Sequence, residues 1–366
     1  MRIVIMAEHD GGGPAGGPLD GSALSRGVAR GWADAAQHDD VDLYLLSDGR
    51  AGFTDALTSI AERTTPAVIE TSRGAETPAQ MVSSGSTAYI EAADVVGAHL
   101  RAVQESGHAP TGDSSAAVGE LLLAARATGA ARVVLGVGND VTCHDGGAGL
   151  LEALGAGTDM ARLEHVRADW ADMTMVLATA SMSPLTGFGG ASASLQTDRG
   201  LDAATAQSYE AQIGTFVDTV DAALRASLPS QVDLLTGAPV RRERTPGAGV
   251  GGGIGYAMQL LGAATVPGAR LVIDEIGMAR QLPGALVVLV THRYDWRSIS
   301  SGVVSESAAA ASAVAAPTVL LADEVMVGRR EGMSLGISSS YARRPQETPE
   351  QLGARVARTW SPPPRP

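Results

Sequence analysis

Residues 2–46 read RIVIMAEHDGGGPAGGPLDGSALSRGVARGWADAAQHDDVDLYLL. Residues 2–6 form a short apolar run of the kind that makes a β-strand, and a loop rich in glycine and proline follows it. Apolar residues then recur at helical spacing between 22 and 37. A second strand at 41–46 completes a β-loop-α-β unit, so this end of the chain predicts a parallel sheet.

The remaining chain alternates short apolar runs with amphipathic segments, which indicates an α/β protein. Strands are predicted at 67–70, 86–92, 131–136, 173–179, 271–274, 285–290 and 318–322, and helices at 119–128, 147–154, 203–228, 254–261 and 308–315. The last residues, which end in SPPPRP, predict a disordered tail over 346–366.

Length, charge and composition exclude several classes of protein. A chain of 366 residues is long enough for two domains. No apolar run approaches the roughly 20 residues of a membrane span, and the N-terminus lacks the layout of a signal peptide, so we expect a cytoplasmic protein with no membrane partner. The net charge of −13 argues against a nucleic-acid partner. The sequence contains no lysine, so no Walker-type or Schiff-base lysine is available.

Four glycine-bearing loops follow predicted strands and carry polar residues. They lie at 8–21, 47–49, 136–147 and 245–253. In an open α/β sheet such loops meet at the carboxyl ends of the strands, where glycine lets backbone N–H groups approach phosphate and carboxylates can hold Mg²⁺. For any single loop, an ordinary turn is an equally good reading, because the chain has 45 glycines. Within the third loop, His144 is predicted to lie on the surface and Cys143 to be a small buried residue.

At these loops the sequence resembles the bacterial type-1 glycerate kinase family. The family patterns GGSATNDGGAGMLQALG and PGAGAAGGLG are similar to GNDVTCHDGGAGLLEALG at 138–155 and PGAGVGGGIG at 246–255. ADGGEGT resembles SDGRAG at 47–52, and NPLxGxxGA resembles SPLTGFGGA at 183–191. TGEGRxDxQS is similar to LVTHRYDWRS at 289–298. The blocks occur in the family's order along nearly the whole chain.

The resemblance implies two α/β domains around a cleft. One is a flavodoxin-like or Rossmann-like parallel sheet made of residues 1–58 and 283–345, and the other is an inserted mixed α/β domain over 59–282. It also implies ATP and Mg²⁺ as cofactors and a small hydroxy acid as substrate. A monomer or a homodimer is expected.

The resemblance further implies roles for particular residues. Three aspartates would share Mg²⁺ binding and deprotonation of the substrate hydroxyl: Asp48, Asp145 and Asp295, with Asp48 and Asp145 as metal ligands. Substrate or phosphate would be bound by Arg199, Arg293, Arg297, Ser298, Asn139, Gly247, Gly249, Gly251 and Gly252. Among these, the glycines would cradle phosphate, and Arg293 or Arg297 would clamp a carboxylate.

Several family residues are replaced in this chain. The lysine of the first loop is missing, the glutamate of the second block is Ala51, and a later lysine falls at Arg199. The family's Glu and Gln in the last block become Thr291 and Arg297. Three hypotheses therefore stand: an active ATP-dependent glycerate kinase, a catalytically impaired homologue that binds a ligand or partner, and a kinase with a changed substrate.

Overall fold

The computed structural model describes residues 1–9, 22–71, 73–100, 112–225, 237 and 241–362. The chain divides into two compact units. Unit 1 comprises Met1–Asp48, Asp55–Ile60 and Pro267–Pro366, and unit 2 comprises Gly49–Thr54 and Ala61–Val266. The returning segment of unit 1 thus begins at Pro267 rather than at the predicted 283, and a short piece of the predicted first domain, Gly49–Thr54, belongs to unit 2. The first glycine loop, at 8–21, lies outside the described residues from 10 onwards.

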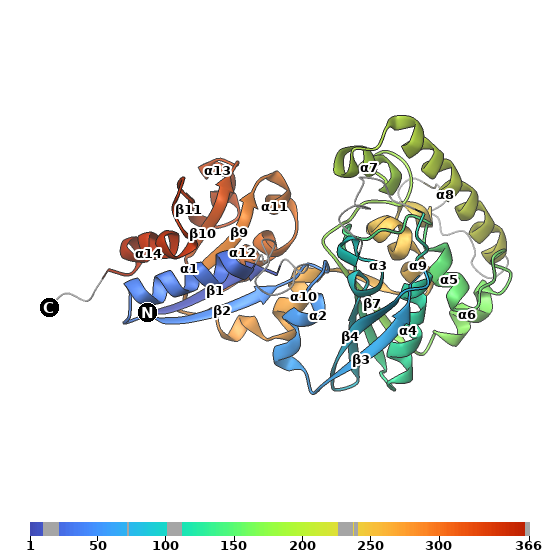
Figure 1. The fold of residues 1–366 in the computed structure, drawn as a ribbon, viewed down its shortest axis with the longest axis horizontal. Helices are drawn as coiled ribbons and strands as arrows, with labels where there is room; N and C mark the ends of the chain where they lie inside the picture. Colours follow the sequence, from blue (N-terminus) through green and yellow to red (C-terminus); the bar gives the residue numbers. More distant parts are fainter. Residues whose placement is uncertain (10–21, 72, 101–111, 226–236, 238–240, 363–366) are drawn as a thin grey trace. The chain divides into compact units, whose positions relative to one another are not determined.

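Unit 1 is built on a five-stranded sheet in the order β11-β10-β9-β1-β2, in which all neighbouring strands are parallel (Figure 1). Its strands are β1 (Arg2–Glu8), β2 (Asp40–Leu46), β9 (Leu286–Tyr294), β10 (Thr318–Val325) and β11 (Ile337–Ala342). Counted along the chain and read from the β2 edge, the order is 2-1-3-4-5, which is that of flavodoxin-like sheets. This confirms the predicted parallel sheet.

The helices of unit 1 correct two of the predictions. They are α1 (Ser22–Ala35), α10 (Gly268–Glu275), α11 (Trp296–Ser300), α12 (Val303–Ala313), α13 (Arg329–Ser334) and α14 (Pro349–Trp360). The strand predicted at 271–274 is wrong, because those residues lie in α10, where the apolar residues occupy one face of a helix. The prediction of a disordered tail is also wrong for Pro349–Trp360, because α14 buries Leu352 and Val356 in the core. Residues 363–366 lie outside the described part of the chain.

Unit 2 contains a six-stranded mixed sheet in the order β3-β4-β5-β6-β7-β8. β3 to β5 pair antiparallel, whereas β5, β6 and β7 pair parallel. The strands are β3 (Arg63–Glu70), β4 (Glu76–Ser84), β5 (Thr87–Glu91), β6 (Arg132–Gly136), β7 (Thr174–Thr179) and β8 (Ala264–Pro267). The sheet confirms the predicted mixed α/β class, although β4 and β8 were not among the predicted strands.

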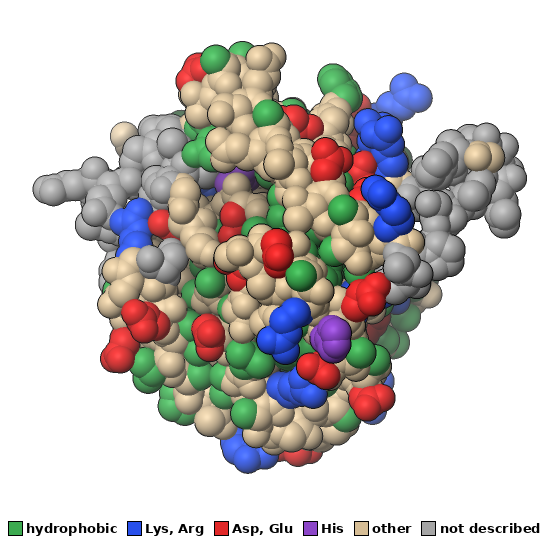
Figure 2. All heavy atoms as spheres, turned by 90° about the vertical axis from the view of Figure 1, so that its right-hand side faces the viewer, with side chains coloured by type: hydrophobic (Ala, Val, Ile, Leu, Met, Phe, Trp, Pro, Cys, Tyr) green, Lys and Arg blue, Asp and Glu red, His purple; other side chains and the backbone are tan. Residues whose placement is uncertain are grey.

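Helices of unit 2 include the long amphipathic α8 that the sequence predicts, and α7, which it does not. The helices are α3 (Ala93–Val96), α4 (Ala116–Ala127), α5 (Ala148–Ala153), α6 (Leu163–Asp169), α7 (Ala191–Arg199), α8 (Ala203–Leu224) and α9 (Ile254–Leu260); α2 (Phe53–Ala56) begins in unit 2 and ends in unit 1. No helix of the described residues combines the length and apolar character needed to cross a bilayer. On the face shown in Figure 2, acidic and basic side chains are interspersed with apolar ones.

Helices α1 and α14 pack with their backbones in direct contact, because each carries a glycine at the crossing (Figure 1). A methyl group added to Gly353 would lie 2.2 Å from the carbonyl oxygen of Val28, and one added to Gly31 would lie 1.9 Å from that of Glu350. Neither oxygen can move without displacing a helix. The two glycines therefore allow the C-terminal helix to pack onto unit 1.

We expect Gly353→Ala to destabilise the protein by about 1–3 kcal/mol, because the new methyl group overpacks a backbone contact. Gly214→Ala on α8 is the matched control, since nothing lies within 4 Å of the added carbon there. That change should stabilise by about 0.5–1 kcal/mol through helix propensity. Thermal and urea unfolding of both variants measure the difference, and equal stabilities would contradict the described packing.

Candidate functional site

The carboxyl edge of the sheet in unit 1 is the first candidate site. In a sheet of this strand order, ligands bind outside the carboxyl ends of the strands where the order reverses, which here is between β1 and β9. The chain leaves β1 at His9, β9 at Asp295 and β2 shortly before Asp48. Two of the predicted carboxylates, Asp48 and Asp295, therefore lie at one edge of one sheet.

Asp295 holds the start of α11. Its Oδ1 atom accepts hydrogen bonds from the backbone N–H of Arg297 at 2.8 Å and of Ser298 at 3.4 Å. This is an N-cap, which satisfies backbone donors that have no partner inside the helix. Only Oδ1 makes these bonds, and Oδ2 bonds none of the described residues. One oxygen of the carboxylate is thus available for a ligand.

Asp48 is a buried carboxylate beside the start of α12. It is 4% exposed. Its Oδ2 atom lies close to Gly302, the N-cap residue, where an added methyl group would stand 3.1 Å away. The positive end of the helix dipole favours a negative charge at this position. Gly302 has a φ of 89°, so the close approach also depends on a conformation that glycine adopts readily.

The three other predicted site residues of unit 1 take part in local contacts. Arg293 donates to Glu324 Oε2 from Nε at 3.1 Å and from Nη2 at 2.9 Å. The guanidinium of Arg297 lies 5.4 Å from the ring centroid of Trp296, and the Ser298 hydroxyl donates to the carbonyl of Arg293 at 3.0 Å. Since the Arg293–Glu324 pair is exposed, an anionic ligand could displace it at small cost.

A pocket within unit 2 is the second candidate site. Loops at the carboxyl ends of β6 and β7, helix α7 and the glycine loop at 245–253 build its wall. Its lining is Asn139, Val141, Cys143, His144, Ser183, Ala191, Ser194, Leu195, Arg199, Gly249 and Gly252. Four of the predicted binding residues, Asn139, Arg199, Gly249 and Gly252, are therefore brought together in one pocket.

Arg199 lies at the end of α7 and reaches the loop after β6. Its Nη2 atom donates to the carbonyl oxygens of Asn139 at 2.8 Å and Val141 at 3.1 Å. Its Nη1 and Nε atoms bond none of the described residues. The arrangement fixes the guanidinium in the pocket wall and leaves donors that can bind an anion. Asn139 in turn accepts a long bond, 3.4 Å, from the N–H of Gly251.

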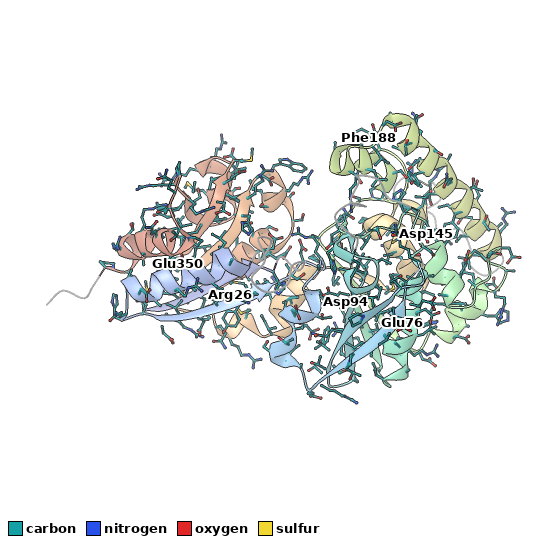
Figure 3. All side chains as sticks on the ribbon, in the orientation of Figure 1. Arg26, Glu76, Asp94, Asp145, Phe188 and Glu350 are labelled. Carbon is teal, nitrogen blue, oxygen red and sulfur yellow. The ribbon has the colours of Figure 1, made fainter. Side chains whose placement is uncertain are left out.

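Asp145 organises the loop between β6 and α5, inside unit 2 (Figure 3). Its Oδ2 accepts bonds from the Ser115 N–H at 2.8 Å, the Ser115 hydroxyl at 3.0 Å and the Gly149 N–H at 3.2 Å. Its Oδ1 accepts from the Gly147 N–H at 2.9 Å. These bonds join the starts of α4 and α5 to one carboxylate. Asp145 therefore has a strong structural role in addition to the one that the resemblance implies.

The glycine loop is packed against the loop that holds Asp145. A methyl group added to Gly252 would stand 2.2 Å from the carbonyl oxygen of Cys143, and one on Gly249 would stand 2.2 Å from that of Pro184. Gly247, Gly251 and Gly252 also have positive φ values of 82°, 62° and 65°. Two of the predicted phosphate-binding amides are already engaged, because Gly249 donates to Ser183 and Gly251 to Asn139. Close packing is thus one reason for these glycines.

His144 is buried, so its predicted place on the surface is wrong. Only 7% of it is exposed. Its Nε2 atom lies 3.0 Å from the Ser192 hydroxyl, and its ring meets that of Tyr209 edge to face at 5.2 Å. Burial lowers the pKa of His144 to about 4, against the opposing effect of the Asp145 charge. Its neighbour Cys143 is buried as predicted, and burial raises the pKa of that thiol.

Glu91 was missed by the sequence reasoning. It ends β5 and is 3% exposed. Its Oε1 accepts from the Gly52 N–H at 3.1 Å and its Oε2 from the Thr54 N–H at 2.9 Å. Asp140 accepts from the Ala51 N–H at 3.1 Å. These carboxylates hold the loop that follows Asp48. In the sequence, the position of Glu91 at the end of an apolar strand was a signal of this role. For His144 there was no such signal, because its burial comes from α7 and α8.

The carboxylates of the two candidate sites can be compared with the ligands that Mg²⁺ requires. Within the described part of the chain, no three His, Cys, Asp or Glu residues gather as a cation site. A magnesium ion bound with a nucleotide needs only one or two carboxylates, together with phosphate oxygens and water. Asp48 and Asp295 fit that requirement in kind. Asp145 fits it less well, because both of its oxygens accept backbone hydrogen bonds.

Comparisons with known proteins agree with the described architecture. A model of the glycerate kinase family matches residues 16–359. An uncharacterized protein from Mycobacterium bovis is 30% identical over 345 residues, covering 93% of this chain and 84% of the relative. The glycerate 2-kinase of Escherichia coli K12 is 25% identical over 310 residues, covering 78% of this chain and 76% of the relative.

A solved structure shares the fold. The crystal structure of a protein provisionally named glycerate kinase 2, from Salmonella typhimurium LT2, matches with a TM-score of 0.69 and 21% identity. The match covers 98% of each chain. A solved structure of the same fold therefore exists.

We expect Asp145→Ala to lower the free energy of unfolding by about 2–4 kcal/mol, because three backbone N–H groups lose a charged acceptor. Asp159→Ala is the control, since the exposed Asp159 accepts one such bond, from Ala161 at 3.1 Å. It should cost less than about 1 kcal/mol. Urea unfolding measures both, and a loss at Asp145 no larger than at Asp159 would refute its structural role.

The buried His144 predicts a pH dependence of stability. In the unfolded chain it binds a proton near its ordinary pKa of about 6.5, whereas the folded protein binds that proton only near pH 4. The unfolded state therefore carries more protons between these values, so stability falls as the pH is lowered through this window, by at most about 3 kcal/mol. His144→Phe should flatten this slope in urea melts at several pH values, while His165→Phe, at an exposed histidine, should not.

Proposed function

Because the chain belongs to the glycerate kinase family, we propose that it is an ATP-dependent kinase that transfers a phosphoryl group to a hydroxyl of glycerate. The family match over residues 16–359 supports the class of reaction. The name of the Escherichia coli relative, glycerate 2-kinase, supports the 2-hydroxyl as the acceptor, with 2-phosphoglycerate as the product.

The observation that carries the proposal is the pocket of unit 2. It combines the guanidinium of Arg199 with the hydroxyls of Ser183 and Ser194 and the imidazole of His144. A guanidinium suits a carboxylate, and the hydroxyls and imidazole suit the hydroxyl groups of a small polar acid. We therefore place the hydroxy acid in this pocket, with Arg199 as the partner of its carboxylate.

In unit 1, Asp48 and Asp295 are the carboxylates that would hold Mg²⁺. When bound, the ion would neutralise charge that develops on the phosphoryl oxygens. The protein's own contribution there is to fix both carboxylates at helix starts, Asp48 beside α12 and Asp295 on α11. Fixed carboxylates need no reorganisation during the reaction, which is the main source of electrostatic catalysis.

The reaction itself requires little covalent chemistry from the chain. The substrate hydroxyl oxygen attacks the γ-phosphorus of ATP, the bond from that phosphorus to the β–γ bridging oxygen breaks, and ADP leaves. The hydroxyl proton passes to a base or to water, since it is lost late in a loose transition state. Positioning and charge stabilisation provide the acceleration. Arginines can supply the positive charge in a chain that has no lysine.

The test is ATP turnover with D-glycerate and Mg²⁺, with the phosphorylated product identified. Turnover above about 1 s⁻¹ would support the kinase. Asp295→Asn should lower kcat by about 10²- to 10³-fold with an unchanged melting temperature, because asparagine caps helices as well as aspartate but carries no charge. Asp274→Asn, at an exposed aspartate of α10, should keep full activity.

Two results would contradict the proposal. Absence of turnover in a folded preparation would refute an active glycerate kinase. An ATP titration would then separate a kinase for a different substrate, which still binds the nucleotide, from an impaired homologue, which does not. Full activity of Asp295→Asn would remove Asp295 from the proposed Mg²⁺ ligands.

A further inference from the structure

His144 is held rigidly in the pocket wall of unit 2. The Ser192 hydroxyl of α7 lies 3.0 Å from Nε2, and Tyr209 of α8 packs edge to face on the ring. A side chain packed on two sides by helices keeps one orientation, and recognition of a small ligand needs such precision. The rigid placement does not by itself say what the ring recognises.

The two ring nitrogens have different surroundings. Nε2 is paired with Ser192. Nδ1 bonds none of the described residues. It is also not among the fully buried polar atoms, so it is partly exposed. Because the ring lines the pocket, Nδ1 is open to a ligand. A neutral imidazole carries one donor and one acceptor nitrogen, so if Nε2–H donates to the serine oxygen, Nδ1 is the acceptor.

Neighbouring groups complement this acceptor. Arg199 from α7 offers only donors, and the thiol of Cys143 stays protonated because burial raises its pKa. Asp145 follows in the chain, but its oxygens accept backbone N–H groups outside the pocket lining. Tyr209 contacts the ring through an aromatic edge. With Nε2–H donating to Ser192, Nδ1 provides an acceptor in the same pocket as the Arg199 cation.

We propose that His144 determines substrate specificity, with its Nδ1 atom accepting a hydrogen bond from one hydroxyl of the bound hydroxy acid. The inference rests on the proposed function and deepens it. A site built to bond a hydroxyl discriminates strongly against an analogue that lacks it, because the polar group of the site is left unpaired. The substrate class is thus a carboxylic acid with a hydroxyl in a defined position, and a monohydroxy acid without that group binds poorly.

The test compares dissociation constants by calorimetry for D-glycerate, lactate and 3-hydroxypropanoate, without ATP. Lactate lacks the 3-hydroxyl and 3-hydroxypropanoate lacks the 2-hydroxyl. We expect the wild type to bind glycerate at least about tenfold more tightly than one of the two. The readout is the selectivity ratio, which is the dissociation constant of the more weakly bound monohydroxy acid divided by that of glycerate. General damage to the pocket would raise both constants by the same factor and leave this ratio unchanged.

His144→Phe keeps the ring and its contact with Tyr209 but removes both nitrogens. It should lower the selectivity ratio to nearly one. His144→Asn can place an amide oxygen close to the position of Nδ1, so it should recover part of the ratio, and it serves as the test if the phenylalanine variant does not fold. His165→Asn, at an exposed histidine of α6, should keep the wild-type ratio.

Unchanged selectivity in folded His144→Phe would overturn the inference, and so would equal binding of all three acids by the wild type. Turnover of glycerate by the wild type in the same preparation separates the two proposals. If the wild type phosphorylates glycerate and the phenylalanine variant keeps its selectivity, only the role of His144 fails. If the wild type neither binds nor phosphorylates glycerate, the proposed function fails, and this inference fails with it.

Discussion

The Asp145 carboxylate ties two helix starts of unit 2 to the loop that carries several residues of the candidate pocket. It accepts hydrogen bonds from the backbone at the starts of α4 and α5, and so it fixes the loop that carries Asn139, Cys143 and His144. The glycine loop can then approach that backbone, with Gly252 directly against Cys143. A buried or half-buried carboxylate is tolerated only where donors surround it, and here the donors are the loop itself. Asp145 therefore supports one of the loops that line the pocket.

Unit 1 stabilises its carboxylates in another way. Its parallel sheet places the ends of β1, β2 and β9 at one edge, where helix starts α11 and α12 provide partial positive charge beside Asp295 and Asp48. At both positions a helix start lies beside the carboxylate and favours its negative charge. One oxygen of Asp295, Oδ2, bonds none of the described residues.

The replaced family residues have different consequences in the two units. In unit 2, the residue at the place of a family lysine, Arg199, stays in the pocket wall and is tied to the loop after β6. In unit 1, Arg297, which replaces a family glutamine, lies over Trp296, while the retained Arg293 pairs with Glu324 on the neighbouring strand. The candidate pocket of unit 2 therefore has a cation at the place of a family lysine, whereas the two arginines of unit 1 contact other side chains of the protein.

Periodicity and motif order determined the α/β class, the parallel sheet of unit 1, and the return of the chain's end to its beginning, because strand and helix patterns are local properties. The same patterns misread 271–274 as a strand and 349–360 as disorder, because a short apolar run does not reveal what it packs against. Only the tertiary structure decided that α14 joins the core through Gly31 and Gly353, and that His144 is buried between α7 and α8. The contacts that bury these residues join positions far apart in the chain, and no local signal in the sequence encodes them.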